Sequence, residues 1–341
     1  MDVTVAVIPR ERFRPLPASL NSLFATIPAA VRVVVIDGGA DESVRRELRR
    51  LQRERGFELI TSERFLLPNE ARNVALDLVE TKYVAFCDND LGYSPGWLQA
   101  LVANAERNDS VAVSPVTLIG PSDPQIIHHA GGDLTLVKDE SGHTRLRRHH
   151  RLGRVRLPDA ELTGFGEVSL EHDYFEYHCV LVDVDTMRKA GGHDERLVMH
   201  EHLDSSLRLK ADGGRITFEP GARVMYTAFN RFVDEDWPYF LYRWSINRAR
   251  TSNRVFAGNW GVTEDSGYAE LHRNRAMLTV LPRLPRLLNR HRVKQAMLRL
   301  YRPGIIALQR EQPDAPAART LARPAPDALE KTGIKVTGTG G

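Results

Sequence analysis

The sequence predicts an α/β fold with half of a doubly wound, mostly parallel sheet at its centre, helices on the faces of that sheet, and a C-terminal helical extension. Two observations carry this prediction. Short runs rich in β-branched residues alternate with helix-compatible stretches over the first ninety residues, as in consecutive β-α-β units. From Trp237 onward, the pattern turns helical, aromatic and basic.

The alternation in the first ninety residues gives the order of the elements. The expected strands are residues 3–8, 31–36, 57–61 and 83–87, and the expected helices are residues 17–24, 41–55 and 69–80. Asn69 is the predicted N-cap of the last of these helices, and Asp41 is expected to cap the helix that follows it. Because helices separate the strands, we expect the strands to run parallel.

After Asp90 the alternation becomes less regular. We expect helices at residues 95–107 and 203–211, and strands at residues 111–116, 178–182 and 215–218. Between Gly142 and Pro158 arginine and histidine are interleaved and no acidic residue occurs, which predicts a basic loop. This loop is either a solvated linker or a mobile segment that contacts phosphate or an anionic acceptor, and the sequence leaves both alternatives open.

Three regions are expected along the chain. Residues 1–230 form the main domain, residues 231–310 a helical and basic extension, and residues 311–341 a Pro/Ala-rich tail that we expect to be disordered. Leucine and arginine recur over residues 283–302 as in an amphipathic helix broken at Pro285. Such helices, from Arg283 onward, could lie against an anionic membrane surface.

Composition limits the function classes. The net charge of +3 is too small to indicate nucleic-acid binding. Cys87 and Cys179 each lie in an apolar run, which favours buried reduced thiols over a disulfide or a metal site. No apolar run approaches the ~20 residues that cross a bilayer, and the amino terminus shows no signal-peptide pattern. We therefore expect a cytoplasmic protein, with peripheral membrane contact at most.

The most informative motif is Asp88-Asn89-Asp90, which follows the apolar run at residues 83–87. Two carboxylates separated by one residue at the end of a buried parallel strand place their oxygens at the edge where α/β sheets bind ligands, and oxygen ligands suit Mg²⁺ or Mn²⁺. The same spacing recurs at Asp183/Asp185 and Asp234/Asp236. Those two pairs do not follow a continuous apolar run, so they are expected to be solvated turns.

Five segments, in the right order, resemble family 2 glycosyltransferases, which are inverting, nucleotide-sugar-dependent enzymes of the GT-A fold. Together they cover about residues 1–230. The segments are residues 3–9 (VTVAVIP), 34–41 (VVIDGGAD), 70–73 (EARN), 88–90 (DND), and 191–195 (GGHDE) with 201–209 (EHLDSSLRL). The resemblance implies a GT-A fold with a Rossmann-like, mostly parallel central sheet.

The resemblance also implies roles for individual residues. The implied donor-binding residues are Pro9, Asp37, Arg72, Asp88, Asn89 and Asp90. Asp37 would contact the nucleotide base, Arg72 the base or the diphosphate, and Asn89 would act as a spacer between Asp88 and Asp90, the implied metal ligands. Mn²⁺ or Mg²⁺ is the implied cofactor.

Two departures from the family pattern concern the catalytic base and the third metal ligand. Glu201-His202 stands where the family usually has Glu-Asp, and Tyr226 ends the strand that normally ends in a metal-binding histidine. Glu201 and His202 can each accept a hydroxyl proton, and we favour Glu201 because a carboxylate also stabilises the developing positive sugar. Asp204 is expected to fix the loop through backbone hydrogen bonds.

The predicted function is metal-dependent transfer of a sugar, with inversion, from a nucleotide diphosphate sugar, by default a UDP-sugar, to an acceptor hydroxyl. The acceptor is a glycan, a lipid-linked molecule or a small molecule. One alternative is a non-catalytic relative that binds nucleotide sugar or carbohydrate. A nucleotidyltransferase is disfavoured, since the segment Arg10 to Arg14 after the first strand contains no glycine for a phosphate loop.

Overall fold

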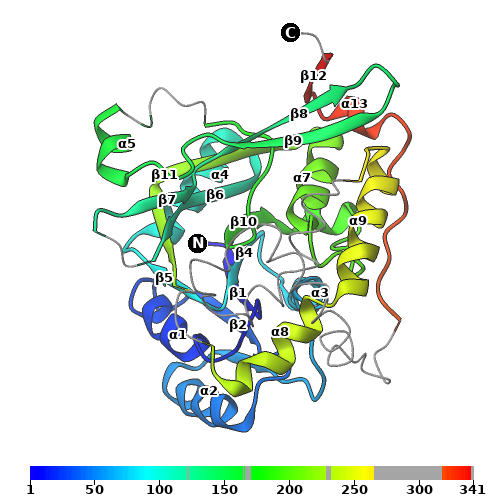
Figure 1. Ribbon diagram of the computed structural model, residues 1–341. Helices are drawn as coiled ribbons and strands as arrows, with labels where there is room; N and C mark the ends of the chain where they lie inside the picture. Colours follow the sequence, from blue (N-terminus) through cyan, green and yellow to red (C-terminus); the bar gives the residue numbers. More distant parts are fainter. Residues whose placement is uncertain (121–122, 164, 166–169, 228–231, 265–316, 339–341) are drawn as a thin grey trace, which may run out of the picture.

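A curled, mixed sheet forms the centre of the protein (Figure 1). The computed structural model describes residues 1–120, 123–163, 165, 170–227, 232–264 and 317–338. Within these residues the main sheet has nine strands in the order β3-β2-β1-β4-β10-β6-β11-β5, and β7 pairs with β6. The strands are β1 (Val3–Ile8), β2 (Arg32–Ile36), β3 (Glu58–Ile60), β4 (Tyr83–Asp88), β5 (Leu91–Tyr93), β6 (Ser110–Ile119), β7 (Ile126–His129), β10 (Cys179–Asp183) and β11 (Arg215–Tyr226).

The first four strands of this order, β3, β2, β1 and β4, run parallel to one another, as predicted. β1 pairs parallel with β2 and with β4, and β2 pairs parallel with β3. β10 then runs antiparallel between β4 and β6, with Cys179 opposite Cys87. This register sets His178 beside Asp88, whose backbone N–H donates to the carbonyl oxygen of His178 at 2.8 Å. The antiparallel strand therefore brings a second segment of the chain to the carboxyl end of β4.

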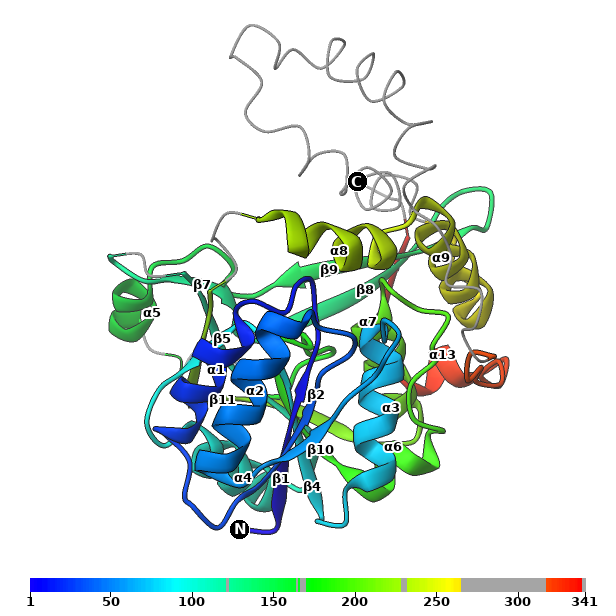
Figure 2. The same ribbon diagram turned by 90° about the horizontal axis from the view of Figure 1, so that it is seen from below.

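Helices cover both faces of the sheet (Figure 2). Since successive residues of a strand point to opposite faces, Val5 and Val7 pack in one core cluster while Ala6 and Ile8 pack in another. The first cluster includes side chains of α1 (Leu16–Phe24), α2 (Glu42–Arg55) and α4 (Trp97–Asn108). The second includes side chains of α3 (Pro68–Leu78) and α6 (Val184–Lys189). The strands are thus buried on both faces, which matches the apolar runs in the sequence.

A small second sheet lies beside the main one, in the order β12-β8-β9. Its strands are β8 (Gly132–Lys138), β9 (Thr144–His150) and β12 (Lys335–Gly338). Its apolar side chains share a core cluster with α7 (Glu201–Ala211), α9 (Ile246–Trp260) and α13 (Ala328–Lys331). Figure 1 shows these three helices beside β8 and β9. The remaining helical segments of the described residues are α5 (Leu157–Thr163), α8 (Trp237–Arg243) and the 3₁₀ turn η2 (Asp234–Asp236).

The prediction of a basic loop between Gly142 and Pro158 is wrong for residues 144–150, which form β9. β9 pairs antiparallel with β8 along its whole length. Arg145, Arg147 and His149 are exposed, whereas the residues between them are half-buried. The alternation is therefore that of a strand with one basic, solvated face, and the lack of an apolar run concealed it.

Two further expectations differ from the structure. Asn69 is not the N-cap of α3: the helix begins at Pro68, which suits the first helical position, and Leu67 is the N-cap. We also expected residues 311–341 to be disordered, but within the described part of this tail α13 and β12 are formed and Ala328 and Ile334 are buried. The Leu/Arg-rich segment at residues 283–302 lies outside the described residues.

Other local predictions are confirmed. The Asp41 side chain accepts hydrogen bonds from the backbone N–H groups of Ser43 and Val44, so it caps α2. The region from Trp237 forms α8 and α9. Among the described residues, no helix combines the length and the apolar character that a membrane crossing requires.

Acid stability is expected to depend on His172, which lies between the two sheets. The backbone N–H of Gly132 donates to Nδ1 of His172 at 3.2 Å, so protonation of Nδ1 would remove this acceptor. Burial lowers the pKa of His172 to about 4. Because this folded-state pKa lies below the unfolded value, the contribution to stability is present above pH 6.5 and is lost as the pH falls toward 4, by about 3 kcal/mol.

We therefore expect His172→Asn, whose amide oxygen can replace Nδ1 as acceptor, to lose about 3 kcal/mol less stability than the wild type between pH 6.5 and pH 4. Urea unfolding at a series of pH values measures this difference. The matched control is His149→Asn on the exposed face of β9. Parallel curves for wild type and His172→Asn would contradict the prediction.

Candidate active site

The candidate site lies at the carboxyl end of β4, where Asp88 is the last residue of the strand and is almost fully buried. Its Oδ2 lies 3.2 Å from Arg10 Nε and 3.3 Å from His178 Nδ1. Its Oδ1 lies 3.9 Å from Arg72 Nη2 and has no hydrogen-bond partner among the described residues. Burial raises the pKa of Asp88 to about 6, although Arg10 and Arg72 oppose this shift.

Asp90 has a similar environment. It is buried, and its Oδ1 also lacks a hydrogen-bond partner in the described part of the chain. Burial raises the pKa of Asp90 to about 7, and the charge of Arg10 acts against this rise. Buried carboxylate oxygens normally have hydrogen-bond partners. Two buried oxygens without one, on Asp88 and Asp90, therefore fit a site for a divalent cation, which takes oxygen ligands. The residues present are therefore suited to hold the implied Mn²⁺ or Mg²⁺.

Asn89 and Pro9 shape the loop that faces these carboxylates. The Asn89 amide accepts from the backbone N–H of Arg10 at 3.3 Å and donates to the carbonyl oxygen of Arg12 at 2.8 Å. Pro9 packs against Gly38, whose φ is +64°, and a Cβ added to Gly38 would lie 2.6 Å from Pro9 Cγ. Asn89 thus does more than separate two aspartates, because it fixes the segment that carries Arg10.

Asp37 follows β2 at the same edge of the sheet and is fully buried. Its carboxylate accepts from the backbone N–H of Ala40 at 2.6 Å and from Arg45 Nε at 2.8 Å. Burial raises the pKa of Asp37, while Ala40 and Arg45 oppose the rise. The structure therefore places Asp37 two strands away from Asp88, with its oxygens engaged by its own loop and by α2.

Arg72 extends from α3 toward Asp88 and is almost fully buried. Its Nη1 donates to Asn69 Oδ1 at 2.8 Å, and its guanidinium carbon lies 3.6 Å from the centroid of the Tyr177 ring. Burial lowers the pKa of Arg72, but Tyr177 and Asp88 raise it. The side chain is therefore held in a fixed orientation beside the predicted metal ligands.

Glu201 and His202 begin α7, after His200 in the left-handed region at φ +63°. Glu201 Oε1 lies 3.5 Å from Arg243 Nη2. His202 Nε2 lies 3.4 Å from Arg148 Nη1 and 3.9 Å from Glu176 Oε1, and burial lowers the pKa of His202. Both candidate bases line one cavity of about 200 Å³, together with Arg10, His128, Glu176, His178, Val198, Met199, Arg243 and Trp244.

Both carboxylate oxygens of Asp204 accept hydrogen bonds from other side chains within the described structure. Its Oδ1 accepts from Trp260 Nε1 at 2.8 Å, and its Oδ2 accepts from Arg208 Nε at 2.8 Å. The predicted structural role fits this arrangement, but the bonds go to side chains of α9 and α7 instead of the backbone. Asp204 therefore ties α7 to α9.

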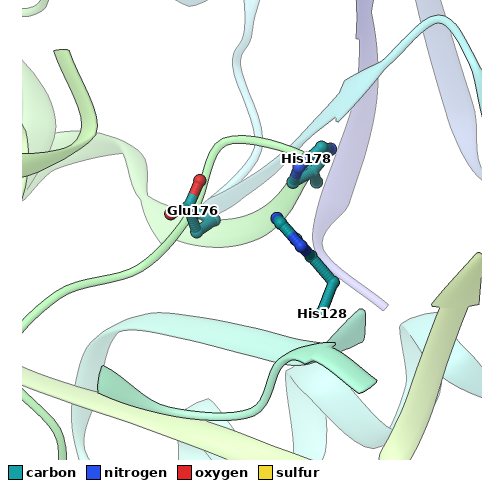
Figure 3. Close-up of side chains that lie close together, drawn as sticks. All are labelled: His128, Glu176 and His178. Carbon is teal, nitrogen blue, oxygen red and sulfur yellow. The ribbon is translucent and has the colours of Figure 1, made fainter. Parts of the chain in front are cut away.

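Several residues of the cavity were missed by the sequence analysis. Arg10 was considered only as part of a loop without glycine, and His128 was not among the candidate residues. Glu176 and His178 were not considered as site residues, although His178 is the first residue of the strand predicted at residues 178–182. Figure 3 shows His128, Glu176 and His178 converging from β7 and from the segment that leads into β10.

Tyr226, at the end of β11, stands where the family resemblance implies a histidine ligand. Its ring centroid lies 4.6 Å from the guanidinium carbon of Arg10 and 4.7 Å from the ring centroid of His178. An aromatic ring that packs on a guanidinium therefore replaces the implied ligand. Two imidazole groups lie beside Tyr226, but they belong to His128 on β7 and to His178, the residue before β10.

Comparisons with known proteins concern the sequence family and the fold. Residues 4–165 match the profile of the family described as Glycosyl transferase family 2. The pre-mycofactocin glycosyltransferase of Mycobacterium tuberculosis is 26% identical over 236 residues, which are 69% of this chain and 44% of that protein. The chain therefore spans less than half the length of the curated relatives it matches.

Among solved structures, a mannosyltransferase from Pyrobaculum calidifontis in complex with GDP-Man and Mn²⁺ superposes with a TM-score of 0.52 at 16% identity. The match covers 90% of this chain and 84% of that chain. At this identity the likeness concerns the fold, and it confirms the predicted α/β architecture of the GT-A type.

Proposed function

We propose that this chain, whose residues 4–165 match the profile of glycosyl transferase family 2, transfers a sugar from a nucleotide diphosphate sugar to an acceptor hydroxyl with inversion at the anomeric carbon. The proposed donor is a UDP-sugar and the proposed cofactor is Mn²⁺ or Mg²⁺. The acceptor is proposed to be a glycan, a lipid-linked molecule or a small molecule. Membrane contact through residues from Arg283 onward stays a prediction, because these residues lie outside the described ones.

One observation supports this proposal most strongly: Asp88 and Asp90 each keep a buried carboxylate oxygen without a hydrogen-bond partner in the described residues. A buried carboxylate oxygen without a hydrogen-bond partner is costly, so two of them at one place favour a protein that uses them to bind a cation. Arg10 and Arg72 adjoin the same pair, and Arg10 also lines the cavity that contains Glu201. The groups needed for donor binding and for proton removal are thus adjacent.

In the proposed reaction the acceptor oxygen forms a bond to the anomeric carbon while the bond from that carbon to the diphosphate oxygen breaks. The Glu201 carboxylate accepts the hydroxyl proton, and Arg243, 3.5 Å away, orients it. A divalent cation, when bound by Asp88 and Asp90, would supply positive charge for the leaving diphosphate. Arg10 and Arg72 add positive charge on the same side: Arg72 is almost fully buried, and Arg10 is half-buried and held 3.2 Å from Asp88.

The proposal is tested by a thermal-shift screen of nucleotide diphosphate sugars with and without Mn²⁺. A donor at 100 times its dissociation constant is expected to stabilise the protein by about 2.7 kcal/mol. We expect a selective response to one nucleotide, larger with Mn²⁺ than without, and a weaker response to the matching nucleoside monophosphate. If no nucleotide diphosphate sugar raises the melting temperature in either condition, the proposal fails.

The same protein then distinguishes an enzyme from a non-catalytic relative. The stabilising donor is incubated with Mn²⁺ and a panel of acceptors, and released nucleoside diphosphate is measured. Release that depends on an acceptor supports glycosyl transfer. Tight donor binding without release in the presence of any acceptor would favour the binding-protein alternative.

A further inference from the structure

We infer that His128, Glu176 and His178 form a second cation site, distinct from the Asp88/Asp90 pair, which takes a first-row divalent metal of the zinc class. Each residue offers one ligand atom, and these atoms all lie within 4.8 Å of one another. Figure 3 shows the three side chains lying close together. Ligands of one zinc ion at 2.0–2.1 Å lie no more than about 4.2 Å apart, so small side-chain rotations would complete the site.

The geometry of the three side chains suits a metal. The rings of His128 and His178 lie edge to face, with their centroids 4.9 Å apart. His178 is buried, and His128 and Glu176 are half-buried. Two imidazoles and one carboxylate therefore lie close together at the border of the protein interior.

The ligand types distinguish this site from the acidic pair. Two imidazole nitrogens and one carboxylate favour zinc and similar transition metals, whereas carboxylates alone favour Mg²⁺, Ca²⁺ or Mn²⁺. The two sets share no residue. They touch where His178 Nδ1 lies 3.3 Å from Asp88 Oδ2.

The site would also be open to the cavity. His128, Glu176 and His178 all line the cavity of about 200 Å³ that contains Glu201 and His202. Three protein ligands with a fourth position facing a cavity are typical of a cation that binds water or an oxygen of a bound molecule. Arg10 Nη1 lies 2.8 Å from His178 Nδ1, and its positive charge is partly balanced by Asp88 at 3.2 Å.

The experiment uses the full chain, stripped of metal and without any sugar nucleotide, titrated with Co²⁺ and then with Zn²⁺. We expect one equivalent of Co²⁺ to produce the visible absorption bands of a low-coordinate ion with nitrogen ligands, and Zn²⁺ to displace it. The faint spectrum of a six-coordinate ion bound by oxygen alone would overturn the inference. This readout needs neither a variant nor catalytic activity.

Variants locate the bound ion. His128→Ala and Glu176→Gln are each expected to weaken Co²⁺ binding by about 100-fold or more, since loss of even an outer partner of a ligand costs about 10–100-fold. His149→Ala, at an exposed position on β9, is the matched histidine control and should bind normally. Far-ultraviolet circular dichroism confirms that each variant is folded, and only folded variants are compared.

Asp90→Asn separates this site from the acidic pair. It should keep the Co²⁺ spectrum while losing Mn²⁺-dependent stabilisation by a donor. Equal Co²⁺ binding in wild type, His128→Ala and Glu176→Gln would overturn the inference, as would loss of the spectrum in Asp90→Asn. Failure of the proposed glycosyl transfer would leave the Co²⁺ result unchanged, so the two proposals fail separately.

Discussion

Replacing Glu201 with glutamine is expected to lower the turnover of sugar transfer by about 10²- to 10⁴-fold, because a general base contributes about that much to the rate. Glutamine keeps the shape of the side chain but cannot accept the hydroxyl proton at neutral pH. Glu201 lines the cavity and contacts Arg243, which in turn lines the same cavity. Since neither residue is placed among the donor-binding residues, the donor affinity should stay close to that of the wild type.

The matched comparison is His202→Gln, because His202 is the neighbouring candidate base and lines the same cavity. Burial lowers the pKa of His202, which makes its imidazole a weaker base than an exposed histidine. We expect His202→Gln to retain much more activity than Glu201→Gln. Initial rates of nucleotide release at saturating donor and acceptor measure both effects, and thermal shift with the donor checks binding. If His202→Gln showed the larger loss of turnover, the base would be His202.

The sequence was sufficient to predict the part of the site that depends on local patterns. An apolar run followed by two acids placed Asp88 and Asp90 at the end of a buried strand, and β4 ends at Asp88. The spacing of β-branched runs predicted β1, β2 and β4, since each strand is buried on both faces. Asp41 caps α2 because its own side chain bonds to residues two and three positions along the chain.

The parts that could not be predicted depend on pairings between distant segments. His178 lies beside Asp88 only because β10 runs antiparallel to β4, and no local feature of the sequence fixes that direction or register. His128 joins them through β7, which pairs with β6. Arg10 reaches Asp88 because Asn89 holds the loop after β1. One sequence does not reveal these contacts.

The error at β9 has a different cause. Its residues alternate between exposed and half-buried positions, but arginine or histidine occupies all three exposed positions and two of the four half-buried ones. Hydrophobic periodicity is the main sequence signal for a strand, and here Leu146 is the single apolar residue of the seven. The half-buried face nevertheless adjoins the candidate site, because Arg148 Nη1 lies 3.4 Å from His202 Nε2.

Replacing Asp90 with asparagine is expected to lower the rate of sugar transfer by about 10²- to 10³-fold. The reason is that the variant loses a ligand of the cation that would neutralise the leaving diphosphate. The change removes a negative charge and keeps the side-chain volume. Asp185→Asn is the matched control, since Asp185 belongs to another aspartate pair of the same spacing and is exposed at the start of α6. Rates with saturating donor and Mn²⁺ are compared with rates after chelation. Chelation should bring the wild type down to the level of Asp90→Asn, and it should lower the variant little further.

A stability measurement separates this chemical role from a structural one. Burial raises the pKa of Asp90 to about 7, so at pH 8 the folded, metal-free wild type carries a charge that its environment disfavours. Asparagine removes that charge, and the metal-free variant should therefore melt at the same temperature as the wild type or higher. If Asp90 were structural, Asp90→Asn would melt lower and lose activity in proportion to its unfolding. An Asp90→Asn protein that kept full, chelator-sensitive activity would show that the cation is bound elsewhere.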